Sequence, residues 1–157
     1  MSAGRAWRRS HAMSTVIDHL NGVLADAVVF YYKLHNYHWF VKGPKFFTLH
    51  AQFEKMYDAW AEHVDDTAER ILQLGGKPQP TLAAALQASA IAEEAGAPDA
   101  KAMVNNTITD LHTQRERILA TIKAADATGD RPTCNILDGV NDAIEKTIWM
   151  LEAHNAG

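Results

Sequence analysis

The chain has 157 residues, of which 47% are hydrophobic and 22% charged. This composition suits one domain with a real core and excludes a disordered or collagen-like chain. Lys, Asp, His or Asn interrupts every apolar run before it nears the roughly 18 residues of a membrane span, so we expect a soluble chain with no membrane partner. Because Cys134 is the single cysteine, an internal disulfide framework and a cysteine-cluster metal site are excluded, and we expect a cytoplasmic protein.

Charge is divided unevenly along the chain. The first 13 residues contain Arg5, Arg8 and Arg9 and no acidic residue, whereas the remainder holds 12 basic residues (15 minus 3) against 19 acidic ones. We therefore predict a flexible basic N-terminal arm at 1–13 and an acidic folded domain at 14–157. The arm lacks the apolar region of a secretory signal. Met13 also fits an alternative start of translation, in which the arm would be absent.

The first half of the sequence predicts two long helices. Apolar side chains recur at steps of three and four residues over 14–41, with Ser14 as the N-cap. Gly43-Pro44 ends this pattern, because proline disfavours helix at the residue before it. A second helix is expected to begin at Phe47 or Thr48 and to run to Gly75-Gly76.

The second half predicts one short helix and two further long ones. The alanine-rich stretch 81–98 indicates a short helix inside a long connection. The third long helix follows Asp99 and stops before Gly129, and the fourth begins after Pro132. No strand pattern or internal repeat competes. The expected fold is all-α, a ferritin-like four-helix bundle with a short helix in the connection between the second and third helices.

Candidate metal ligands gather on the first two helices. His35 and His38 lie near the end of the first helix. The second helix carries one strip of acidic and imidazole side chains, since its members fall within about 100° of one another on a helix wheel. Asp58 and Glu62 fall on the same broad strip, so spacing alone does not choose among the candidates. The strip comprises His50, Glu54, Asp65 and Glu69.

One straight helix cannot close a metal site with this strip. His50 and Asp65 are 15 residues apart in sequence, which is about 22 Å along a helix, whereas ligands lie about 2 Å from their ion. The strip is symmetric about a point beside Trp60, so a two-fold axis there would place His50 near the partner's Glu69 and Glu54 near the partner's Asp65. The alternative, a di-iron site inside one bundle, needs Glu-x-x-His motifs, and the sequence has none. Carboxylates and imidazoles without thiolates suit Fe(II), Mn(II) or Zn(II), and the oxygen-rich set favours iron.

Four stretches of the sequence form recognisable motifs: HWFVKGP at 38–44, FFTLH at 46–50, DDTAER at 65–70 with Gly75-Gly76, and EKTIWML at 145–151. Together they resemble the Dps family, the miniferritins known as DNA-binding proteins from starved cells. The resemblance implies subunits assembled into a hollow dodecamer with ferroxidase sites at two-fold interfaces. It also implies oxidation of Fe(II) by hydrogen peroxide, storage of ferric mineral inside the cage and protection of DNA from oxidative damage.

The resemblance also assigns roles to residues. His38 and His50 match the two histidine ligands that one subunit supplies, and Asp65 and Glu69 match the carboxylates of the other subunit; we expect these four to be catalytic. Glu54 matches the acid one turn after the second histidine and joins the metal set. Trp39 matches the aromatic residue beside the site, which could intercept stray oxidising equivalents. We leave His35 outside the ligand set, because an interface histidine is favoured over a relay residue.

The sequence departs from the family where iron enters the cage. Family members commonly carry an acidic residue near the start of the fourth helix, lining a three-fold pore, and here that stretch reads Thr133-Cys134-Asn135. Asp126, Asp130 and Asp138 are the nearby acids. We expect them to keep a negative funnel, because the local field attracts Fe(II) rather than any single residue.

The charge distribution bears on DNA binding. Arg5, Arg8 and Arg9 could contact phosphates through avidity over many subunits, but the acidic body opposes this. DNA is therefore not favoured as a partner, and nucleoid association is only an alternative to a purely cytoplasmic location. The competing functions are a DNA-compacting architectural protein with an incidental metal site and a helical scaffold with no redox role.

Overall fold

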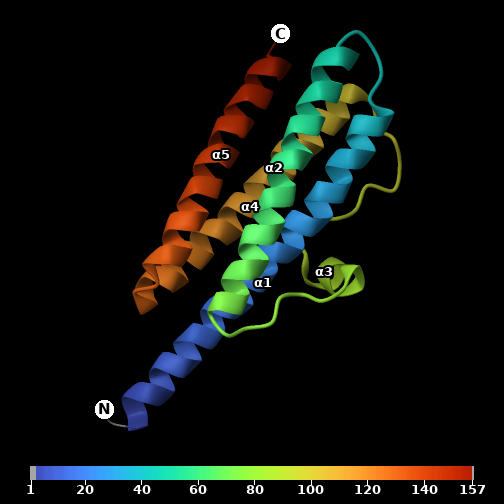
Figure 1. The fold of residues 1–157 in the computed structure, drawn as a ribbon. Coiled ribbons are helices and arrows are strands. Elements are labelled where there is room, and N and C mark those ends of the chain that lie inside the picture. The colour runs from blue at the N-terminus through green and yellow to red at the C-terminus, as the bar shows by residue number, and fades with distance from the viewer. Residues whose placement is uncertain (1–2, 157) are drawn as a thin grey trace.

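The computed structural model describes the backbone of residues 3–156 and the side chains of residues 13–156. These residues form five helices and no strand. The four long helices lie side by side as a bundle, and the short one rests against the outside of α1 (Figure 1). The all-α four-helix bundle predicted from periodicity is confirmed. The helices are α1 (Ala3–Phe40), α2 (Phe46–Gln73), α3 (Leu82–Ala88), α4 (Ala100–Thr128) and α5 (Arg131–Asn155).

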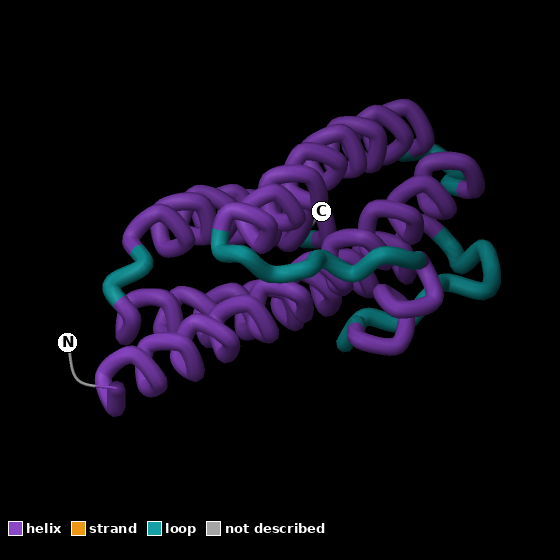
Figure 2. The backbone as a smooth tube through the Cα atoms, turned by 60° about the horizontal axis from the view of Figure 1, so that its bottom comes forward, coloured by secondary structure: helices purple, strands orange, loops and turns teal. Residues whose placement is uncertain are grey.

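The connections set the helix directions. A short turn joins α1 to α2 and another joins α4 to α5, so each of these pairs is antiparallel (Figure 1). Between them the chain returns along the whole bundle, and α3 interrupts this long connection (Figure 2). As a result α4 runs in the same direction as α2, which is the crossover topology expected of a ferritin-like bundle.

The predicted breakpoints coincide with glycines that adopt positive φ. Gly43 follows α1 at φ 105°, Gly75 follows α2 at 79°, and Gly129 caps α4 at 75°. A side chain is strained in this left-handed region, whereas glycine is not. α4 begins directly after Asp99, as expected, whereas α5 begins at Arg131 and therefore before Pro132 rather than after it. The Asp99 and Asp130 side chains accept hydrogen bonds from the first-turn amides of these two helices.

The start of α1 differs from the prediction. The helix begins at Ala3 rather than after Ser14, so its first turns project beyond the bundle (Figure 1). The stretch has no proline and is rich in alanine and arginine, which favour helix, and its one glycine, Gly4, lies in the first turn. Ser14 is therefore an exposed interior position of the helix instead of its N-cap. The division of the chain at residue 13 into arm and domain stays a prediction.

The core is centred on α1, which contacts α2, α3 and α4. Phe30 meets Trp60 of α2 edge to face at 4.9 Å, and Tyr37 lies 5.6 Å from Phe53. Burial of apolar side chains, these rings among them, is the main stabilising contribution to a bundle of this size. The largest fully buried side chains are Tyr37, Phe30, Phe53, Leu20, Leu34, Ile71, Met103, Leu111, Ile118, Leu137, Ile144 and Val16.

One segment of α1 corrects the expectation that no apolar run is long enough to span a membrane. Among the residues described, Met13–Phe40 meets that test by length and composition. Half of its most apolar window is buried inside the fold. The apolar character of this segment follows from its position, since a helix that packs on three neighbours needs apolar residues over most of its surface.

A buried polar seam between α1 and α4 holds the long connection in place. The carboxylate of Asp26 accepts hydrogen bonds from Ser89 and from the Ala90 amide, and it pairs with Arg117 at 3.0 Å. Lys33 pairs with Asp110 at 2.7 Å and donates to the Ala92 carbonyl. Burial raises the pKa of both carboxyl groups, although hydrogen bonds and the nearby cations oppose that shift. These contacts fix the connection, and with it α3, against α1.

Candidate metal centre

His38 and His50 lie next to each other at the end of the bundle where a short turn joins α1 to α2. His38 lies in the last turn of α1 and His50 near the start of α2, and the short turn between the helices brings their rings together. The ring centroids are 3.7 Å apart with planes inclined by 22°. Both side chains are partly buried. The two predicted histidines therefore form a single pair within one chain.

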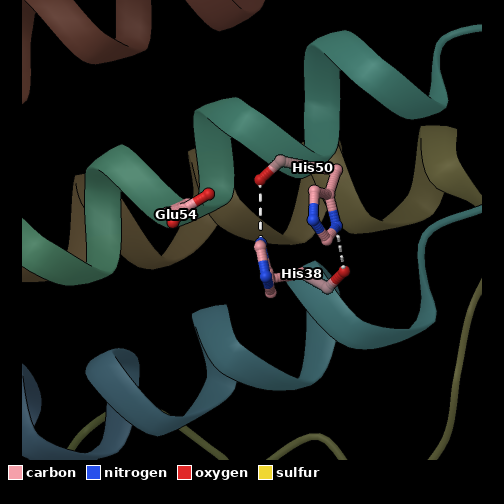
Figure 3. A group of neighbouring side chains, drawn as sticks. All are labelled: His38, His50 and Glu54. Atoms are coloured by element: carbon pink, nitrogen blue, oxygen red, sulfur yellow. Dashed lines mark hydrogen bonds between the residues drawn. The ribbon is translucent and has the colours of Figure 1, made fainter.

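Reciprocal hydrogen bonds orient this pair. The His38 Nδ1 atom lies 2.9 Å from the His50 backbone oxygen, and the His50 Nδ1 atom lies 2.9 Å from the His38 backbone oxygen (Figure 3). A carbonyl oxygen only accepts, so each Nδ1 carries the proton and donates it. The Nε2 lone pair of both rings is then available to a metal ion. Metal-binding histidines are commonly oriented in this way by a backbone carbonyl.

Glu54 completes a group of three metal-ligating side chains. It lies one turn after His50 on α2, and its exposed carboxylate approaches the histidine pair (Figure 3). One ligand atom from each of His38, His50 and Glu54 lies within 4.8 Å of the other two. Two atoms about 2.1 Å from one ion are at most about 4.2 Å apart, so small side-chain rotations suffice for all three to bind it.

Asp65 and Glu69 do not join this group within the chain. Both are exposed on α2, and Asp65 lies about 22 Å along the helix from His50. The described residues offer neither carboxylate a hydrogen-bond or ion-pair partner. The five predicted ligands therefore divide into a group of three and a separate pair, as the spacing required. The two-fold arrangement that would unite them stays a prediction.

An aromatic cluster adjoins the histidine pair. Trp39 is 55% exposed, and its ring lies 5.4 Å from His35. The His35 ring stacks on Tyr57 at 3.8 Å, and Tyr57 meets His38 edge to face at 5.4 Å. Burial, followed by the carboxylates of Glu54 and Asp58, raises the pKa of Tyr57, so its phenol keeps the proton at neutral pH. Sequence reasoning singled out Trp39 but missed Tyr57, whose position in the apolar stripe of α2 was its only signal.

Asp130 is not a free acid for a pore, contrary to the sequence-based expectation. It is 7% exposed, and its carboxylate contacts Arg70 at 2.6 Å. It also accepts hydrogen bonds from the amide and the hydroxyl of Thr133, at the start of α5. The arginine therefore neutralises its charge.

The other two candidate pore acids are exposed. Asp126 pairs with Arg131 at 3.0 Å, which weakens its contribution to a negative field. Asp138 has no ion-pair partner among the described side chains. The candidate pore is thus reduced to these two residues. The side chains of Arg5, Arg8 and Arg9, the candidate DNA contacts, lie outside the described residues.

Comparisons with known proteins agree with the fold. A family model described as a ferritin-like domain matches residues 17–156. The DNA protection during starvation protein of Brevibacillus brevis is 42% identical over 134 residues, covering 85% of this chain and 90% of that protein. The crystal structure of a Dps protein from Bacillus brevis is 40% identical, covers 92% of this chain and 97% of its own, and superposes with a TM-score of 0.90.

A more distant solved structure bears on the metal chemistry of the fold. The Dps protein from Vibrio cholerae O1 is 30% identical, covers 91% of this chain and 90% of its own, and has a TM-score of 0.88. It is described as a member of a broad superfamily of ferritin-like diiron-carboxylate proteins.

Proposed function

The chain belongs to the Dps family of ferritin-like proteins, and from this premise we propose that it is an iron-storage and detoxification protein. In this proposal it acts as a ferroxidase. It oxidises Fe(II) with hydrogen peroxide at sites shared between two subunits, stores the ferric product as mineral inside a hollow dodecamer, and so protects DNA from oxidative damage. Cytoplasmic location, with nucleoid association as the alternative, is part of the same proposal.

The observation that carries the proposal is the orientation of the His38 and His50 side chains. Their Nδ1 protons are committed to backbone carbonyls, which leaves two Nε2 lone pairs beside the Glu54 carboxylate. Two neutral imidazoles and a carboxylate, with no thiolate, are a donor set that binds Fe(II) well and tolerates Fe(III). Three ligands also leave coordination positions open, which a site that turns over its metal requires.

The second subunit supplies the remaining ligands in this proposal. Asp65 and Glu69 are exposed and without partners among the described residues, so they are available to another copy of the chain. A two-fold axis near Trp60 would bring the partner's Asp65 and the partner's Glu69 to the histidine pair. Each dimer would then contain two equivalent sites, and closed assembly of such dimers would produce the cage.

The chain's own residues have distinct tasks in the proposed reaction. Fe(II) is the substrate, and the histidine pair and carboxylates hold it while peroxide accepts its electrons. Two ferrous ions supply the two electrons that break the oxygen–oxygen bond of one hydrogen peroxide. With two further water molecules the products are two FeOOH units of mineral and four protons.

DNA compaction is the weaker alternative. The relative from Brevibacillus brevis is named for DNA protection, yet protection by removing iron and peroxide needs no DNA contact. The body of this chain is acidic and repels phosphates. Only the arginines at positions 5, 8 and 9 favour DNA as a partner, and that partnership stays secondary here.

The proposal is tested by a crystal of the protein soaked with Fe(II) under anaerobic conditions. We expect anomalous iron density between two chains, bound by the His38 and His50 Nε2 atoms of one chain and by carboxylates of the other. Light scattering of the same preparation should show a large closed oligomer. Iron bound only inside one bundle, or a stable monomer at micromolar concentration, would contradict the shared site.

A further inference from the structure

The aromatic rings beside the candidate metal centre form a connected series that metal binding alone does not explain. Tyr57 lies 5.4 Å from His38 and stacks at 3.8 Å on His35. His35 in turn lies 4.7 Å from Tyr31 and 5.4 Å from Trp39. These distances are between ring centroids and fall in the range of direct aromatic contact.

The series has a direct branch between tyrosines and an extension along α1. Tyr31 and Tyr57 lie 6.4 Å apart with nearly perpendicular rings, and Tyr32 lies 6.1 Å from Trp39. The His35 ring is fixed among them, because its Nδ1 atom lies 3.0 Å from the Tyr31 backbone oxygen. Among the described residues, no other group of oxidisable rings touches the centre.

We propose that Tyr57 is the first member of an aromatic relay that carries one-electron oxidising equivalents from the metal centre to Tyr31 and Trp39. The inference rests on the proposed ferroxidase function and extends it. It assigns a redox role to two tyrosines in addition to the tryptophan that the family resemblance indicated. His35 acts as the packed bridge between these rings and is itself neither oxidised nor a ligand.

The proposed relay would remove hydroxyl radicals that form at the metal centre. When a single ferrous ion meets peroxide, the oxygen–oxygen bond breaks after one electron, and the products are Fe(III), hydroxide and a hydroxyl radical. The Tyr57 phenol can transfer a hydrogen atom to that radical, which gives water and a tyrosyl radical. Electron and proton exchange with Tyr31 or Trp39 then moves the radical away from the centre.

A second ferrous ion closes the sequence. It supplies one electron to the aromatic radical, a proton from solvent restores the ring, and the ion becomes Fe(III). The sum is two ferrous ions, one peroxide and one proton converted to two ferric ions, one hydroxide and one water. With the relay, a reaction that began with transfer of one electron ends with two ferrous ions oxidised per peroxide, as in the ferroxidase reaction. No radical is released from the protein.

The first experiment mixes the assembled protein with peroxide and less Fe(II) than one ion per site. Freeze-quench electron paramagnetic resonance measures aromatic radicals, and a spin trap measures hydroxyl radicals, both per ferrous ion oxidised. We expect Tyr57→Phe to lower the aromatic radical yield several-fold and to raise the spin-adduct yield several-fold. Trp39→Phe should remove the tryptophan component of the spectrum and leave the tyrosyl component.

Trp149→Phe is the matched control for this experiment. Trp149 is 66% exposed on α5, and no aromatic ring contact is recorded for it among the described residues, so its removal should change neither yield. If the wild type forms no aromatic radical, or if Tyr57→Phe leaves both yields unchanged, the relay is wrong.

A second experiment separates failure of the relay from failure of the ferroxidase proposal. Azide radicals from pulse radiolysis oxidise tryptophans of the metal-free protein, and absorption follows electron transfer from tyrosine to the tryptophan radical. We expect a first-order phase that is independent of protein concentration. The Tyr31→Phe/Tyr32→Phe/Tyr57→Phe variant, which keeps only Tyr37, should lose this phase, and restoring Tyr57 should return it. A phase that persists in the triple variant, or that is absent from the wild type, would overturn the relay whatever the iron assay shows.

Discussion

Arg70 of α2 and Asp130 at the start of α5 form an ion pair of 2.6 Å that joins the last turn of one helix to the first turn of the other. Their side chains are only 12% and 3% exposed. The same carboxylate caps α5 by accepting from the Thr133 amide, and the Arg70 Nε atom donates to the Thr133 hydroxyl. One acidic side chain thus performs two structural tasks, which leaves no charge for an iron pore.

Replacement of Asp130 should be strongly destabilising. Asp130→Ala leaves the buried Arg70 guanidinium without its neutralising carboxylate, although its hydrogen bonds to Thr133 and Gln73 remain. It also removes the helix cap, so we expect the free energy of unfolding to fall by about 3–5 kcal/mol. Urea unfolding at one fixed protomer concentration measures this, since oligomer stability depends on concentration.

Two variants serve as controls for that measurement. Asp126→Ala breaks an ion pair whose side chains are 65% and 66% exposed, and it should cost less than about 1 kcal/mol. Arg70→Met/Asp130→Asn removes both charges and keeps a capping side chain, so it should cost less than Asp130→Ala. Equal losses for Asp130→Ala and Asp126→Ala would contradict the structural role of the buried pair.

Burial of Cys134 should suppress its reactivity. The residue is 1% exposed, and desolvation raises the pKa of its thiol above the ordinary value of 9.0. Because the thiolate is the reactive form, iodoacetamide at pH 8 should modify the native protein about 100-fold or more slowly than the unfolded chain. Mass spectrometry follows the reaction, and this single cysteine makes the product unambiguous.

The same pKa shift predicts how stability depends on pH. A thiol with a raised pKa in the fold contributes stability that is complete below pH 9.0 and is lost as pH rises through the raised value. Relative to Cys134→Ala, the wild type should therefore lose stability above pH 9. Parallel stability curves for the two proteins across this range would show that burial does not perturb the thiol.

Local signals in the sequence were sufficient to predict the helical bundle. Gly43, Gly75 and Gly129 adopt a backbone conformation that only glycine adopts easily. The ends of α1, α2 and α4 and the starts of α2 and α5 could therefore be placed to within a few residues. The family resemblance, rather than spacing, assigned His38 and His50 to one subunit as a pair of ligands. The structure supplies the physical reason for their proximity, because a tight turn between two antiparallel helices brings the residues on either side of it together.

The features that sequence reasoning missed depend on distant partners. The sequence alone gives no reason to distinguish Asp130 from an exposed acid. In the fold, Arg70, 60 residues earlier, forms a buried ion pair with it. The sequence pattern predicts Tyr57 only as a core residue of the second helix. Its stacking on His35, which lies on the other helix of the pair, is visible only in the fold. The start of α1 was expected at Ser14 instead of Ala3 because a capping residue, rather than helix propensity, was used to place it.

The N-terminal arginines should affect DNA and not iron. Deletion of residues 2–12 is expected to leave the rate of Fe(II) oxidation unchanged and to weaken any retention of DNA in a gel. Retention by the full-length protein should also fall steeply with salt, because phosphate contacts release counterions. A full-length Arg5→Gln/Arg8→Gln/Arg9→Gln variant serves as the control, because it removes the three charges and keeps the length of the chain. Equal gel shifts for all three proteins would remove the arm from any DNA contact.

The shared site predicts complementation between two inactive variants. A chain with His38→Ala/His50→Ala lacks the histidine half of every site, and a chain with Asp65→Ala/Glu69→Ala lacks the carboxylate half. Homo-oligomers of either variant should therefore oxidise Fe(II) poorly. In a mixed dimer, one site receives both lesions and the other receives none. Co-assembly of the two variants should restore up to about half of the wild-type rate for each mixed dimer.

The control and the opposing outcome follow from the same geometry. Asp58 and Glu62 are exposed on the same strip of α2 but belong to neither half of the site. An Asp58→Ala/Glu62→Ala chain should therefore be active alone, and it should restore the histidine-deficient chain no less well than the Asp65→Ala/Glu69→Ala chain does. If instead all five ligands acted within one bundle, each defective chain would keep its own damaged site, and mixing two inactive variants would recover nothing. Native mass spectrometry verifies that the assemblies are mixed. If such assemblies stay as inactive as either parent, the shared-site model is wrong, because that model requires one intact site in every mixed dimer.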